Sequence, residues 1–74
     1  MSQIINDIEI DGYLYDIRPF FDADQSEDGI DIYRADDGAH IGEMLGISFP
    51  DPGDMDEMDD FKKELKDWLD TYIR

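Results

Sequence analysis

Residues 8–17 largely alternate between hydrophobic and polar side chains, the pattern of β-strands with one buried face. Ile8 and Tyr15 lie on either side of Asp11-Gly12, a dipeptide that strongly favours a two-residue hairpin loop. Such a loop places Ile8 opposite Tyr15, so the hydrophobic faces of the two strands coincide. Pro19 then either ends the hydrogen-bonded ladder or marks an edge of the sheet.

A second pair of strands follows the polar stretch at residues 22–29, which we interpret as a loop. Ile30 and Ile32 alternate with an outward Asp31, which predicts a third strand. A turn at residues 36–38 then leads into a fourth strand. Its register stays open, because a two-residue and a three-residue loop would place Ile41 on opposite faces.

Hydrophobic residues at three- and four-residue spacing predict an amphipathic helix near the C-terminus. They are Met58, Phe61, Leu65, Trp68, Leu69 and Tyr72. Asp51 is a suitable N-cap with Pro52 at the first helical position, and Asp54 with Glu57 is a second possible capping pair. Acidic residues near the start and basic residues toward the end also suit the helix dipole.

These elements predict one α+β domain spanning residues 1–74. We expect a four-stranded antiparallel β-meander packed against one C-terminal α-helix. The expected bounds are strands at about 4–10, 13–19, 30–35 and 39–45, and a helix at about 52–73.

Charge is the most unusual property of the chain. The net charge is −15 over 74 residues, and residues 1–61 alone hold 18 acidic and two basic residues. Such a field repels nucleic acids and anionic membranes and attracts basic surfaces. The chain has no cysteine, no apolar run near the length of a membrane helix and no signal-peptide pattern, so we expect a cytoplasmic protein of the host cell.

Two chemical interpretations of the acids are rejected. Asp24, Ser26 and Asp28 have the spacing of an EF-hand loop, but Asp31 and Ala35 stand where an apolar residue and a bidentate glutamate belong. We therefore expect no metal and no cofactor. His40 is the only histidine, with no serine or cysteine nucleophile near it in sequence, so we expect no enzymatic activity.

The remaining interpretation is an anionic surface that imitates nucleic acid. Carboxylates three or four residues apart on a helix are about 5–6 Å apart, of the order of a phosphate ladder with its ~3.4 Å rise per strand. We expect such a surface to bind lysine and arginine residues of a partner. The candidate partner-binding residues are Asp54, Asp56, Glu57, Asp59 and Asp60 in the helix, with Asp7, Glu9, Asp16, Asp31, Asp36 and Asp37 in the hairpins extending the surface.

In size, charge and sheet-plus-helix layout, the chain resembles the small acidic inhibitors of phages and mobile elements. The residues that carry the likeness are Asp7, Glu9, Asp16, Asp31, Asp36, Asp37 and the run at 51–60. Anti-CRISPR proteins and anti-restriction DNA mimics belong to this group. The resemblance implies a non-catalytic inhibitor that blocks the basic DNA- or RNA-binding site of a CRISPR effector, nuclease or similar host protein, without binding nucleic acid or membranes itself.

Three other interpretations stay open at this point. The chain could be an immunity or antitoxin-like partner that neutralises a basic protein away from its nucleic-acid site. It could be a structural phage or plasmid protein. The charge could also serve solubility or adaptation to high salt.

Overall fold

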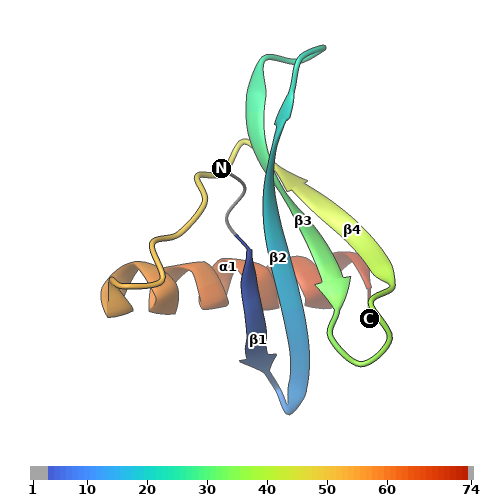
Figure 1. Ribbon diagram of the computed structural model, residues 1–74, viewed down its shortest axis with the longest axis vertical. Coiled ribbons are helices and arrows are strands. Elements are labelled where there is room, and N and C mark those ends of the chain that lie inside the picture. Colours follow the sequence, from blue (N-terminus) through green and yellow to red (C-terminus); the bar gives the residue numbers. More distant parts are fainter. Residues whose placement is uncertain (1–3, 74) are drawn as a thin grey trace.

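The computed structural model describes residues 4–73 and has the predicted α+β architecture, an antiparallel meander with one helix (Figure 1). The ends of the predicted domain, residues 1–3 and 74, lie outside the described residues. The strands are β1 (Ile5–Ile10), β2 (Tyr13–Asp22), β3 (Glu27–Arg34) and β4 (His40–Leu45), in the order β1-β2-β3-β4. The helix α1 (Met55–Tyr72) lies across one face of the sheet, so the molecule has two layers.

The first hairpin has the predicted register, with Ile8 opposite Tyr15. Asp11 and Gly12 both have positive φ, 53° and 86°, as a tight two-residue hairpin turn requires. Between Ile5 and Ile8 the ladder contains a β-bulge, at which Asp7 adopts φ 59°. The Asp7 N–H donates to Asp16 Oδ1 at 3.0 Å, which holds this unusual conformation.

The second hairpin is longer than the sequence predicted. β2 continues through Pro19 to Asp22 and β3 begins at Glu27, so only residues 23–26 form the loop. Within residues 4–73, the β1 ladder reaches Ile17 and β3 is the strand paired with Pro19, so this proline lies at a position where the described ladder needs no second partner. Phe20 packs over Gly29 across the pair, where a Cβ would lie 2.5 Å from the ring.

The β3–β4 connection has five residues, 35–39, and not the two or three that the sequence predicted. The Arg34 N–H donates to Ala39 O and the Gly38 N–H donates to Arg34 O, both at 2.8 Å. β4 then begins at His40, one residue later than expected. The register shifts between the Ile32–Gly42 and Tyr33–His40 pairs, which leaves Ile41 as an extra, half-buried residue beside the core.

The helix starts at Met55 with Asp54 as its N-cap, so the prediction of an Asp51 cap and a start at Pro52 was wrong. Asp51 instead closes a separate turn, in which its backbone carbonyl accepts from the Asp54 N–H at 3.0 Å and its Oδ1 accepts from the Gly53 N–H at 2.9 Å. The last turn of α1 has no basic residue, and Arg74, the base expected to end the helix, lies outside the described residues.

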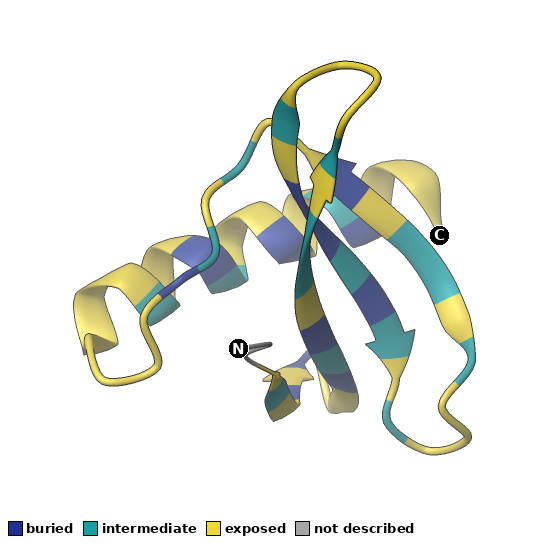
Figure 2. Ribbon diagram, turned by 45° about the horizontal axis from the view of Figure 1, so that its top comes forward, coloured by how far each residue is buried: buried dark blue, intermediate teal, exposed yellow. Residues whose placement is uncertain are grey.

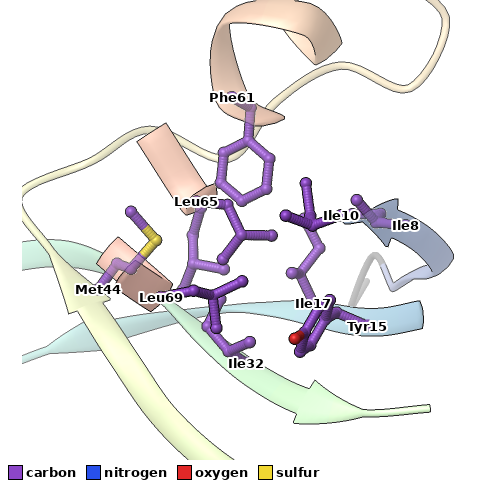
Figure 3. Close-up of a cluster of buried hydrophobic side chains, with 10 residues drawn as sticks. Ile8, Ile10, Tyr15, Ile17, Ile32, Met44, Phe61, Leu65 and Leu69 are labelled. Atoms are coloured by element: carbon purple, nitrogen blue, oxygen red, sulfur yellow. The ribbon is translucent and has the colours of Figure 1, made fainter. Parts of the chain in front are cut away.

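The core lies between α1 and the inner face of the sheet (Figure 2 and Figure 3). Its fully buried side chains are Ile17, Ile30, Ile32, Leu65 and Leu69. Within residues 4–73 no polar or charged side chain is buried, so every carboxylate described here is at least partly accessible to solvent. The charges therefore belong to the surface, and the small hydrophobic core determines where that surface places them.

Candidate functional site

The acidic run on the first half of α1 is the strongest candidate site. Its carboxylates all belong to exposed residues, Asp54, Asp56, Glu57, Asp59 and Asp60. The helix is fixed by Phe61, Leu65 and Leu69, which are buried against the sheet. The stripe that anchors α1 therefore turns the acidic positions toward solvent.

The cap keeps the first turn of this acidic helix formed. Asp54 Oδ1 accepts from the Asp56 N–H at 3.0 Å and from the Glu57 N–H at 3.2 Å. Asp56 and Glu57 add negative charge near the positive end of the helix dipole, which favours them there. Asp59 and Asp60 lie about one turn further along, where the dipole contributes little.

None of these five carboxylates is neutralised by a basic side chain of the described chain. The ion pairs within residues 4–73 join Arg34 to Asp37, His40 to Asp31, and Lys66 to both Asp11 and Asp70. All of them lie outside the acidic run. The run therefore presents negative charge without direct ion pairs on a rigid element, and Lys62 and Lys63 follow it on the next turn.

One flank of α1 adds an acid that sequence reasoning missed. Glu57, Asp60 and Glu64 follow one another at three- and four-residue spacing and line a shallow hollow of about 270 Å³ beside Ile47 and Pro50. The same helical spacing in the sequence could have identified Glu64. Charge density alone did not point to it, because Glu64 follows two lysines and stands apart from the dense run before Phe61.

Among the hairpin acids, Asp7, Glu9 and Asp16 lie together on β1 and β2. Asp7 and Asp16 are joined by the backbone hydrogen bond at the bulge, and Glu9 pairs with Leu14 in the ladder. Glu9 and Asp16 alternate with buried residues of their strands, so they point away from α1.

Two of the other hairpin acids, Asp31 and Asp37, lie close to a basic side chain of the chain. Asp31 lies between two buried residues of β3 and also points away from α1, where its Oδ1 lies 3.2 Å from His40 Nε2. Asp37 Oδ2 is 3.6 Å from Arg34 Nη1, and Asp36 is exposed in the same loop. The structure therefore places Asp16 and Asp31 on the face opposite the helix, where they do not extend the α1 surface.

The outer face of the sheet is less uniformly negative than α1. The Arg18 guanidinium lies 5.5 Å from the centre of the Tyr33 ring, and the Tyr33 and His40 rings are 5.1 Å apart. With Asp31 beside His40, this is a mixed cluster of cation, aromatic and acid. A flat partner surface would contact either this face or the acidic half of α1.

Neither a metal cluster nor a membrane helix is found in the described part of the chain. Across residues 4–73, no three His, Cys, Asp or Glu side chains are grouped so as to hold a metal ion. The helix α1 lacks the long apolar run of a membrane-spanning segment.

Hydrogen bonds to the carboxylates of Asp11 and Asp70 raise the pKa of Lys66 above its ordinary value.

Comparisons of the chain with protein-family models, with curated proteins and with solved structures find no match.

Proposed function

We propose that this protein is a non-catalytic inhibitor that imitates nucleic acid and occupies the basic DNA- or RNA-binding site of another protein. A CRISPR effector or a nuclease of the host is the target class that the resemblance suggests. The observation that supports the proposal is the acidic run at the start of α1, whose five carboxylates belong to exposed residues and form no ion pair within the described chain.

The spacing of these charges suits a groove that binds a phosphate backbone. At 1.5 Å per residue, the ten steps from Asp54 to Glu64 span roughly 15 Å along the helix axis. One DNA strand places about four to five phosphates over that length, at ~3.4 Å each. The helix carries six acids over the same distance, Asp54, Asp56, Glu57, Asp59, Asp60 and Glu64.

The rigidity of the helix matters as much as the number of its carboxylates. The carboxylates project from a capped helix whose opposite stripe is buried, so a partner orders few additional backbone segments on binding. Most are aspartates, whose short side chains lose less conformational entropy than glutamates when they are fixed. Lysine and arginine residues of the target would pair with these carboxylates. The pairing would release counterions from both surfaces, as the binding of a nucleic acid does.

The decisive experiment neutralises α1 while keeping its fold. The variant carries Asp54→Asn, Asp56→Asn, Glu57→Gln, Asp59→Asn and Asp60→Asn, and asparagine at position 54 still caps the helix. The matched control makes the same change in net charge at acids outside the candidate surfaces, with Asp22→Asn, Asp24→Asn, Glu27→Gln, Asp67→Asn and Asp70→Asn.

Proteins captured from a host lysate at low salt would be identified by mass spectrometry and assayed for nucleic-acid binding with each variant. We expect the wild type and the control to inhibit, and the α1 variant to lose inhibition while its circular dichroism is unchanged. Added DNA should displace the wild type from the target. Equal inhibition by the α1 variant would refute the proposal, and binding that DNA does not displace would favour a partner that neutralises a basic protein away from its nucleic-acid site.

A further inference from the structure

The edge strand β4 combines an open hydrogen-bonding edge with an apolar groove, at a distance from the acidic run of α1. β4 is an outermost strand of the sheet, and among residues 4–73 it pairs with β3 alone (Figure 1). The edge of a sheet presents unpaired N–H and C=O groups to which another strand can add. The other edge of the same sheet is β1.

The two edges differ in how strongly they oppose strand addition. β1 contains the bulge at Asp7 and the charges of Asp7 and Glu9, which are features that protect edge strands. β4 also has an irregular pairing at Ile41, but its ladder is regular from Gly42 to Leu45. From His40 to Leu45 it has a single acid, Glu43, and no lysine or arginine. β4 is thus the less protected edge.

Alternate residues of β4 direct their backbone N–H and C=O groups toward the open edge, where they can pair with an added strand. The Gly46 N–H donates to Asp28 O at 2.9 Å, which fixes the alternation of the antiparallel ladder. Met44 and Gly42 then direct their backbone groups toward β3. Glu43 and Leu45 direct theirs toward the open edge.

An apolar groove of about 560 Å³ lies beside this edge. Ile41, Met44 and Leu45 of β4 line it together with Trp68, Tyr72 and Ile73 at the C-terminal end of α1, and Glu43 is the one acid in this lining. Tyr72 and Ile73 are exposed by 71% and 48%. A strand added to β4 would direct alternate side chains into this groove, so those side chains should be apolar.

The acidic residues around β4 favour an added strand with basic residues at its ends. Asp36 lies in the loop before β4, Glu43 lies within it, and Asp28 lies beside its far end. Antiparallel pairing of β4 with a second copy would bring the Asp36 end of one chain against the Asp28 end of the other. That arrangement is repulsive, whereas lysine or arginine at the ends of an added strand would meet opposite charge.

We propose that the β4 edge binds an extended segment of a partner protein as a fifth strand, with apolar residues at alternate positions and basic residues at both ends. The site goes beyond charge mimicry by α1, since it adds directional backbone hydrogen bonds and an apolar anchor. A target held at both places would be bound by two separate surfaces of this small domain.

The test uses a synthetic peptide of about nine residues, in which isoleucine and threonine alternate between lysine pairs. We expect amide chemical-shift changes in the wild-type protein to centre on β4 and the Trp68 side chain. A matched peptide with glutamate in place of lysine should bind at least about tenfold more weakly. Shifts confined to other elements, or equal affinity for both peptides, would overturn the proposal without any variant.

Two substitutions then separate the backbone from the side chain. Leu45→Pro removes an outward N–H at a position where an edge strand tolerates proline, and Leu45→Ala keeps the N–H. We expect the affinity for the lysine peptide to fall about tenfold for Leu45→Pro and less than about threefold for Leu45→Ala. Equal affinities in two folded variants would contradict the proposal.

Two further measurements identify the occupant and separate the two sites. Sedimentation should show a monomeric wild type, and a dimer that Leu45→Pro dissociates would assign the edge to a second copy and overturn the proposal. The five-acid α1 variant should still bind the peptide, because its substitutions lie away from β4. Loss of inhibition with retained peptide binding would support both sites. Retained inhibition with retained peptide binding would overturn only the α1 site, and loss of peptide binding would overturn the β4 site.

Discussion

Asp54 has two roles in the structure, and substitution can separate them. Its Oδ1 accepts hydrogen bonds from the N–H groups of Asp56 and Glu57, and its charge belongs to the acidic run. Asp54→Ala removes both the cap and the charge. Asp54→Asn removes the charge and keeps an acceptor oxygen in the same place.

The magnitudes indicate that the cap contributes more to stability than the charge does. Loss of an N-cap costs about 1 kcal/mol, and loss of a favourable charge at the helix dipole costs roughly 0.5 kcal/mol. Relief of repulsion from Asp56 and Glu57 offsets a few tenths of a kcal/mol, by analogy with like-charge pairs on helices. We expect Asp54→Ala to lower the free energy of unfolding by about 1 kcal/mol and Asp54→Asn to change it by no more than about 0.5 kcal/mol.

Urea and thermal unfolding, followed by far-ultraviolet circular dichroism, measure both variants. In a domain of this size a loss of about 1 kcal/mol lowers Tm by about 4–8 °C. If Asp54→Asn lowered the free energy of unfolding as much as Asp54→Ala does, the charge of Asp54 and not its capping hydrogen bonds would stabilise the first turn. That result would refute the larger contribution of the cap. Wild-type stability in Asp54→Ala would show that the cap contributes nothing.

Four further outcomes are expected. Gly42→Ala should destabilise the protein by about 1–3 kcal/mol and shift the fluorescence of Trp68, because the added Cβ would lie 2.5 Å from that ring; unchanged emission would contradict this contact. Leu65→Ala should lose about 2–5 kcal/mol, enough to unfold so small a domain at 25 °C in circular dichroism. Lys66 stabilises the fold while it is protonated, since its pKa is raised in the native state. Its contribution is complete below pH 10.5 and is lost as pH rises through the raised pKa, so the stability difference from Lys66→Gln should vanish in strong alkali. Added salt should raise the urea midpoint of a chain with net charge −15, and a falling midpoint would oppose this account of self-repulsion.

The sequence predicted best those features that depend on neighbouring residues. Asp11 and Gly12 determine the first turn by their backbone preferences, and the turn determines the register of Ile8 against Tyr15. The hydrophobic stripe likewise predicted the buried face of α1 at Phe61, Leu65 and Leu69, although Tyr72, its last member, is exposed. Both follow from local conformation and periodicity, so both could be derived without a structure.

Features that depend on distant contacts or on competing local signals were predicted wrongly. The second hairpin extends through polar residues because β2 and β3 continue to pair, with Phe20 packed over Gly29. The helix start was misplaced because Asp51 begins a turn with Pro52 and Gly53 at its central positions. This is β-turn chemistry that the sequence does contain.

The candidate site was only partly predictable. That the acids of α1 are exposed follows from the hydrophobic stripe, and strand alternation places Asp16 and Asp31 on one face of the sheet. Which face the helix covers depends on tertiary packing. The separation of the acids into two surfaces therefore became visible only in the three-dimensional structure.

The bulge at Asp7 has a consequence for assembly. Growth of a fibril by strand addition needs two receptive edges on every molecule, one to accept and one to offer. Here the left-handed backbone of Asp7, clamped by Asp16, interrupts the regular ladder along β1. A molecule that accepts a strand only at β4 can add one strand there, and its β1 edge accepts no further strand. Association through β4 therefore gives a complex of limited size and not a growing fibril.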